Sequence, residues 1–113
     1  MKFHRQERVS KLIMEYLNEL ILREVEVPGA LVTITDVEIS KDLEHAKVLV
    51  SILPSEKSEG VLKVLEKSQN KLQFTLGRKL NIRPMPKISF EIDYGMEKAA
   101  RIEKLSLEEE NKK

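Results

Sequence analysis

The hydrophobic positions of this chain repeat at different intervals along its length, and each interval predicts a different element. The first apolar run keeps the three-to-four-residue spacing of an amphipathic helix, and Pro28-Gly29 must end it. We therefore predict an opening helix of about five or six turns. Its inward positions are Val9, Leu12, Ile13, Tyr16, Leu17, Leu20 and Ile21.

Two runs typical of strands follow, separated only by the polar loop from Ser40 to His45. Leu31 to Ile39 is rich in β-branched residues, and its apolar phase shifts between Ile34 and Val37, as happens across a β-bulge. From Ala46 to Ile52 apolar and polar residues alternate. These patterns predict a β-hairpin whose first strand is slightly bent.

Helical spacing resumes after Pro54-Ser55 and continues to Leu80, over about 25 residues. The apolar stripe is interrupted at Ser68, Gln69 and Asn70, and asparagine tolerates a left-handed backbone better than other non-glycine residues. We therefore predict a helix kink, or a corner between two helices, at these three residues.

A third strand and a terminal helix complete the predicted elements. Pro84 and Pro86 forbid further helix, and apolar residues then alternate from Ile88 to Ile92. Weak helical spacing from Met96 to Leu107 predicts a short helix at the end. The order helix, strand, strand, helix, helix, strand favours an α+β fold, with helices packed on one face of a three-stranded sheet.

The composition fits a single domain. A chain of 113 residues can bury about two-thirds of the surface that it exposes when unfolded. We assign residues 1–107 to this domain and residues 108–113, which are charged and lack apolar side chains, to a disordered tail. No apolar run approaches the length of a membrane span, which is about 18 residues, and no signal segment is visible, so we expect a cytoplasmic protein without membrane contact.

The sequence offers little that could support catalysis or a cofactor. It has no cysteine and only two histidines, far apart, so we expect neither a disulfide nor a metal site, and no cofactor. Ser40, Asp42 and His45 are the nearest approach to a catalytic set, but an exposed hairpin loop gives them no enclosed pocket. We interpret Ser40 and Asp42 as loop-forming side chains and predict that the protein is not an enzyme.

Charge is sorted by position along the chain. Residues 61–90 contain seven lysines and arginines against one acid, whereas residues 25–60 contain seven acids against three lysines. Such a basic segment is typical of a surface that binds a polyanion, although charged helix faces are often simply solvated. The candidate binding residues, including two from a second basic cluster at the start of the first helix, are Arg78, Lys79, Arg83, Lys67, Lys71, Lys87, Arg5 and Arg8.

The end of the long helical region is the most suggestive part of the basic segment. Arg78, Lys79 and Arg83 lie on the helix end and on the loop that leaves it, and guanidinium groups grip phosphates bidentately. Gly77 costs about 1 kcal/mol inside a helix, which indicates a close approach, either by packing or by a ligand. Aromatic residues are too few to predict base stacking on an exposed sheet.

Two blocks of the sequence closely resemble the signature of the ribosome-binding factor A family. The first runs from Val32 to Val48. The second comprises Leu76 to Leu80 with Pro86, Phe90 and Asp93. Residues 5–9 and Arg101-Ile102 also match, so the resemblance covers roughly residues 3–105.

The resemblance implies a type II KH-like fold, whose element order agrees with the one predicted from periodicity. It also implies a non-enzymatic factor that binds 16S rRNA in the small (30S) ribosomal subunit and assists its late maturation and rRNA processing, often with cold-adaptation phenotypes. We expect a monomer, and leave open whether a ribosome-associated GTPase is a further partner. The alternative is a protein-interaction or dimerisation module that uses the basic helix.

This chain departs from the motif by which KH domains clamp nucleotides. That motif is a GxxG loop between paired helices. The family that this chain resembles has an Ala-x-Gly kink at that place, and this chain has Ser68-Gln69-Asn70 there. We therefore expect RNA binding to depend on lysine and arginine contacts to the backbone, with specificity that comes from RNA shape.

Overall fold

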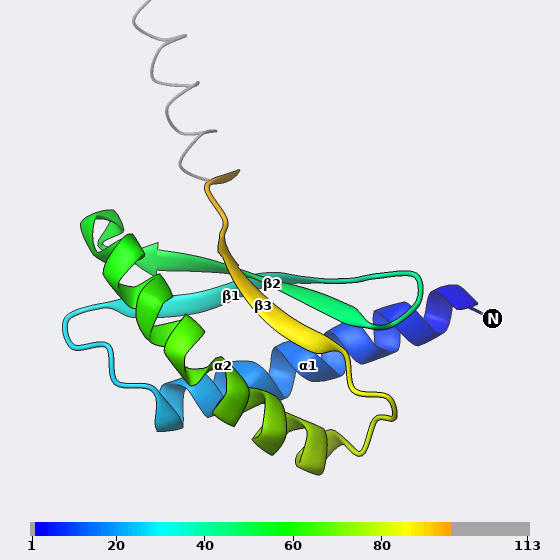
Figure 1. Ribbon diagram of the computed structural model, residues 1–113. Helices are drawn as coiled ribbons and strands as arrows, with labels where there is room; N and C mark the ends of the chain where they lie inside the picture. The colour runs from blue at the N-terminus through cyan, green and yellow to red at the C-terminus, as the bar shows by residue number, and fades with distance from the viewer. Residues whose placement is uncertain (1, 96–113) are drawn as a thin grey trace, which may run out of the picture.

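The computed structural model describes residues 2–95, in which two helices pack on one face of a three-stranded sheet (Figure 1). The elements are α1 (Lys2–Glu24), β1 (Leu31–Ile39), β2 (His45–Leu53), a 3-10 turn (Ser55–Lys57), α2 (Ser58–Leu80) and β3 (Lys87–Ile92). The predicted α+β architecture is confirmed. The predicted helix from Met96 to Leu107 and the tail of residues 108–113 lie outside the described residues.

The sheet has the order β1-β2-β3 and mixes both kinds of pairing. β1 and β2 form the predicted antiparallel hairpin, whereas β3 runs parallel to β2. A parallel neighbour cannot be reached by a tight turn, so the chain needs a long crossover connection. The 23-residue helix α2 is that connection, and it contacts β3, β2 and α1.

The predicted bulge in β1 is confirmed. The register with β2 shifts between Ile34 and Asp36, so that Thr35 has no partner opposite it. Ile34 and Val37 therefore both face the core although they are three residues apart, and each is buried.

The core fills the space between the two helices and the sheet. Its fully buried side chains include Ile13, Leu17, Leu20, Leu65, Leu72, Leu76, Val48, Val50 and Ile88. Burying one such side chain contributes about 1.5–3 kcal/mol. Because this packing fixes the rotation of both helices, it also decides which of their side chains face solvent.

The predicted corner between two helices at Ser68, Gln69 and Asn70 is wrong, because α2 runs through all three residues without interruption. Between β2 and β3 the described chain therefore has one α-helix where two were predicted. The other alternative, a kink within one helix, stays a prediction. Gln69 interrupts the apolar stripe for another reason. Its side-chain amide donates to the backbone oxygen of Ile88, the first inward residue of β3, at 2.5 Å.

Gln73, one turn further along α2, makes a double contact with the same strand and with the residue just before it. Its Nε2 donates to the Pro86 oxygen at 2.7 Å, and its Oε1 accepts from the Ile88 N–H at 2.8 Å. On the opposite edge of the sheet, Gln6 and Ser10 of α1 donate to the backbone oxygens of Ile39 and Val37, at 3.1 and 2.6 Å. Each helix thus ties itself to an outer strand by two polar side chains spaced four residues apart.

The left-handed asparagine of this chain is Asn81. It follows the last residue of α2 with φ 50° and ψ 40°, and its N–H donates to the Gly77 oxygen at 3.1 Å. A left-handed residue at this position is a common way to end a helix. Apart from Leu43, no other non-glycine residue of the described chain has a positive φ, so Asn70 has helical geometry.

We predict that Gln73→Met lowers the free energy of unfolding by about 1–3 kcal/mol, because the change keeps the side-chain volume and removes the bonds to Pro86 and Ile88. Equilibrium denaturation by urea measures the loss. Lys67→Met, on the exposed side of the same helix, is the matched control and should change stability by under about 0.5 kcal/mol. Equal effects of the two changes would contradict a stabilising role for Gln73.

The two asparagines should respond to alanine with opposite signs. Asn70→Ala is expected to stabilise the protein by about 0.5 kcal/mol, because alanine is the better helix former. Asn81→Ala should destabilise it by about 1 kcal/mol, because alanine resists the left-handed backbone, and Asn81→Gly should restore stability. Thermal unfolding of the three variants tests this, and a loss of stability in Asn70→Ala would contradict the helical assignment.

Candidate nucleic-acid interface

Three of the predicted binding residues come together at one end of the molecule. Arg5 and Arg8, near the start of α1, and Arg83, between α2 and β3, line one open groove. Figure 1 shows the N-terminal end of α1 and the segment that joins α2 to β3 at this same end. Within residues 5–95, no acid lies within ion-pair distance of these guanidinium groups. We call this feature the arginine groove.

The fold holds the arginine groove from both sides. On α1, Val9 is buried in the core and Leu12 is half-buried, so the arginines before them are carried by a fixed helix face. On the other side, the left-handed Asn81 ends α2, and Ile82 then packs against the core. Arg83 therefore leaves an anchored backbone and remains exposed.

Arg78 and Lys79 lie next to the arginine groove on the last turn of α2. The Arg78 guanidinium carbon is 5.8 Å from the centre of the Phe74 ring, one turn earlier. The Lys79 Nζ is 5.0 Å from the centre of the Tyr16 ring on α1. Both are cation–π contacts, which orient the side chains while leaving the cations exposed to a ligand.

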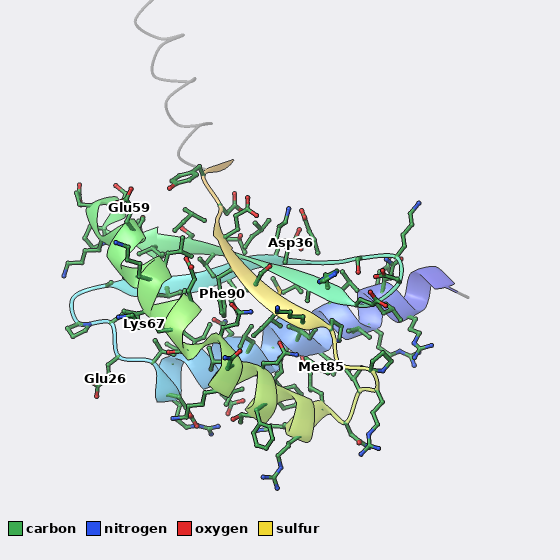
Figure 2. The ribbon with its side chains drawn as sticks, in the orientation of Figure 1. Glu26, Asp36, Glu59, Lys67, Met85 and Phe90 are labelled. Atoms are coloured by element: carbon green, nitrogen blue, oxygen red, sulfur yellow. The ribbon has the colours of Figure 1, made fainter. Side chains whose placement is uncertain are left out.

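The other three predicted residues lie elsewhere. Lys67 is exposed further back along α2 (Figure 2). Lys71 Nζ is 3.4 Å from Glu24 Oε2, so its charge is partly neutralised. Lys87 alternates with the buried Ile88, which places it on the face of the sheet that carries no helix. Their part in binding stays a prediction.

The exposed side of α2 adds a residue that the candidate set omits. Lys63 and Lys67 are one turn apart. Phe74 follows Lys63, and Arg78 follows Lys67, after 11 residues in each case. Since 11 residues make about three turns, the four side chains form one stripe about 22 Å long. This spacing is visible in the sequence and would have identified Lys63 as a continuation of the basic surface.

The hairpin loop is held by its own side chains. The Ser40 hydroxyl donates to Asp42 Oδ1 at 2.5 Å, and the same oxygen accepts from the Glu44 N–H at 3.0 Å. These two bonds, in that order, lower the pKa of Asp42 below its ordinary value. Ser40 Oγ also accepts from the backbone N–H of His45 at 3.0 Å. The interpretation of Ser40 and Asp42 as loop-forming residues is confirmed.

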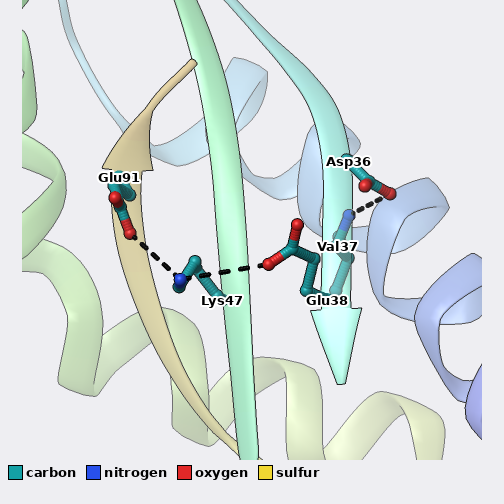
Figure 3. Close-up of polar contacts among 5 residues, drawn as sticks. All are labelled: Asp36, Val37, Glu38, Lys47 and Glu91. Atoms are coloured by element: carbon teal, nitrogen blue, oxygen red, sulfur yellow. Dashed lines mark hydrogen bonds and ion pairs between the residues drawn. The ribbon is translucent and has the colours of Figure 1, made fainter. Parts of the chain in front are cut away.

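Acidic side chains occupy the helix-free face of the sheet. Lys47 Nζ on the central strand lies 3.9 Å from Glu38 Oε2 on β1 and 3.6 Å from Glu91 Oε2 on β3 (Figure 3). Asp36, beside the bulge, accepts a hydrogen bond from the Val37 N–H at 2.9 Å. One lysine between two carboxylates leaves this row with net negative charge, so a polyanion is better accommodated at the arginine groove.

The same face contains an interaction that links the two outer strands. The bulged Thr35 of β1 donates its hydroxyl to Asp93 Oδ2, just after β3, at 2.7 Å. Asp93 Oδ1 accepts from the Gly95 N–H at 2.8 Å. The Thr35 bond and then the Gly95 bond lower the pKa of Asp93 below its ordinary value.

Neither a metal centre nor a membrane span is found in the part of the chain that the structure describes. Residues 2–95 contain no group of three or more histidines, acids or cysteines placed to hold an ion. Among the same residues, no helix combines the length and apolarity that crossing a bilayer requires.

The fold and the groove define a small α+β domain with a concentrated basic surface at one end. A family model described as ribosome-binding factor A matches residues 5–106. The ribosome-binding factor A of Dictyoglomus thermophilum is 40% identical over 113 residues, which cover 94% of this chain and 94% of that protein. The chain therefore belongs to the ribosome-binding factor A family.

Solved structures agree with this assignment. The crystal structure of ribosome-binding factor A from Thermus thermophilus matches with a TM-score of 0.68 at 27% identity, covering 77% of this chain and 94% of that one. A homology model of the Thermus thermophilus protein, fitted into a cryo-EM map of a 30S complex, matches with a TM-score of 0.66 at 28% identity, covering 74% and 90%.

Thr35→Val should raise the pKa of Asp93 toward its ordinary value, because the variant keeps the side-chain shape and loses the hydroxyl donor. NMR titration of the Asp93 carboxyl carbon measures the shift. A lowered folded-state pKa contributes stability that is complete above the unfolded value, about 3.9, and is lost as pH falls through the folded value. The stability advantage of the unsubstituted protein over Thr35→Val should therefore shrink on acidification, and an advantage independent of pH would contradict this role.

Proposed function

We propose that this protein binds 16S rRNA in the small (30S) ribosomal subunit and assists late maturation of the subunit, including rRNA processing, without catalysis. The arginine groove is the observation that carries the proposal, because it joins guanidinium groups from α1 and from the segment after α2. A polyanion with a folded backbone offers phosphates to such a cluster. The Thermus thermophilus relative fitted into a 30S complex supports the choice of partner.

The chemistry of this binding follows from the residues available. Arginine presents a rigid fork of donors that matches two phosphate oxygens at once, and Arg5, Arg8 and Arg83 are all exposed. Arg78 and Lys79 extend the cationic surface along the end of α2. Phosphate contacts position a protein on RNA without reading its sequence. We therefore propose recognition of backbone shape, in which each basic residue adds affinity that salt weakens.

The proposal includes a type II KH-like fold that lacks the KH clamp. A GxxG clamp requires a loop between two helices. Here α2 continues through Ser68, Gln69 and Asn70, where no glycine is present. The uninterrupted helix supports binding by the basic surface in place of a clamp on four nucleotides.

We further propose a monomeric, cytoplasmic factor. The family resemblance suggests phenotypes in cold adaptation, and a ribosome-associated GTPase is left open as a further partner. Neither the cold-adaptation phenotype nor the GTPase depends on the binding surface, so an experiment that contradicts either of them leaves the proposed surface unaffected.

The triple variant Arg5→Gln, Arg8→Gln and Arg83→Gln should bind purified small subunits more weakly and with a flatter salt dependence. Each lost phosphate contact removes about 0.7 from the slope of log affinity against log salt, so three contacts remove about 2. Sedimentation binding at several salt concentrations measures affinity and slope together, and denaturation confirms that the variant remains folded.

A second triple variant, Arg23→Gln, Lys47→Gln and Lys57→Gln, has the same charge change away from the arginine groove. It should keep the salt slope of the unsubstituted protein. If the two triple variants lost affinity equally, net charge and not the groove would govern binding. If neither lost affinity, the protein-interaction or dimerisation module would become the better explanation.

A further inference from the structure

Phe74 is an exposed aromatic side chain within the basic surface. Of its surface, 66% is accessible to solvent, whereas Leu72 and Leu76 on the same helix are buried in the core. Phe90 is also buried, and Tyr16 is covered by Lys79. Phe74 therefore contributes little to the core, and the part of its ring that Arg78 does not cover is available to a partner.

Phe74 and Arg78 together form a ridge between two hollows. On one side the hollow is lined by Gly77, Ile82, Met85 and Arg83, with Met85 contributed by the segment between α2 and β3 (Figure 2). On the other side it is lined by Thr75 and Lys79. The Phe74 ring therefore lies beside the apolar side chains of Ile82 and Met85. Arg83 lines the hollow on one side of it, and Lys79 lines the hollow on the other.

Gly77 keeps the floor of the first hollow open. A Cβ atom there would lie 3.6 Å from the Met85 Cγ and 3.9 Å from the Met85 Cβ, which are ordinary van der Waals contacts. Packing would therefore accept alanine, which is the better helix former. Of the two explanations for this glycine, space for a ligand fits the structure better than close packing.

We propose that the hollow between Phe74 and Met85 holds one unpaired base of the bound RNA, stacked on the Phe74 ring beside Arg78. Every base has a π-face, and aromatic side chains stack on it without regard to sequence. Arg83 and Lys79 are placed to contact the phosphates on either side of that base. The phosphates of a nucleotide can pair with the three cations around this ring, whereas an apolar anchor of a protein partner would leave them without a counter-charge.

This inference rests on the proposed function and makes it more specific. Contacts to backbone alone would accept duplex RNA, whereas a stacked base requires a nucleotide that is free to leave its helix. The preferred binding site would then be a loop, a bulge or an unpaired junction of the rRNA.

Phe74→Ala should weaken binding to purified small subunits roughly 5- to 150-fold, the range that one base–aromatic stack supplies. The salt slope should not change, because no phosphate contact is lost. Leu22→Ala is the matched control, since Leu22 is an exposed apolar residue on α1, 72% accessible, and lines none of these hollows. It should bind like the unsubstituted protein.

A second variant detects the stack directly. The chain has no tryptophan, so Phe74→Trp introduces a single fluorophore at the ridge. Its fluorescence should be quenched by an oligoadenylate of about ten nucleotides, and not by inorganic polyphosphate, which supplies the charge without bases. Leu22→Trp should show no quenching with either probe.

The outcomes separate the base site from the proposed function. Unchanged affinity in Phe74→Ala, with normal salt-dependent binding by the unsubstituted protein, would overturn the base site alone. Weaker binding of Phe74→Ala without quenching of Phe74→Trp would overturn the stack and assign Phe74 to a protein contact. Absence of salt-dependent binding by the unsubstituted protein would overturn both proposals.

Discussion

The parallel pairing of β3 with β2 is the constraint on which the rest of this structure depends. It requires the chain to cross the full length of the sheet before β3 can begin, and α2 supplies that crossing. The end of α2 and the segment that follows it are thereby placed beside the start of α1. Without this crossing, Arg83 would not meet Arg5 and Arg8.

Electrostatics and packing act together in this arrangement. The apolar stripes of the two helices face the sheet, and the basic residues at the end of α2 and the start of α1 are left on the surface. Acidic residues alternate with buried ones on the strands, so they fall on the opposite, helix-free face. The acids of the strands and the basic residues of the arginine groove therefore lie on different surfaces, because each element has one fixed inward side. Lys47 and Lys87 are the basic residues of the strands that share the acidic face.

Much of the fold could be predicted from local patterns. The alternation in each strand, the phase shift between Ile34 and Val37, and the helical spacing of the long helices all depend on neighbours close in sequence. The corner at Ser68, Gln69 and Asn70 was wrong because Gln69 bonds to the backbone of a strand that comes later in the chain. A polar residue in an apolar stripe has the same appearance in sequence whether it breaks the helix or docks it.

The candidate site could be predicted only in part, for a related reason. Net charge identified the basic segment, but the meeting of Arg83 with Arg5 and Arg8 depends on how distant elements dock. The pairing of Lys71 with Glu24 likewise joins two helices and has no local signal. The face of the sheet on which Lys87 lies could have been predicted, because Lys87 alternates with the apolar Ile88 along β3. The charge count alone did not use this alternation.

The polar side chains that tie the helices to the outer strands also limit how this protein can associate with others. An outer strand normally offers free N–H and C=O groups, onto which a strand from another chain can add. Here the Ile88 N–H and oxygen on one edge and the Val37 and Ile39 oxygens on the other already have partners from α2 and α1. At these positions a guest strand could extend the sheet only by displacing the side chains of α1 and α2, which makes the two edges less open to strand addition here.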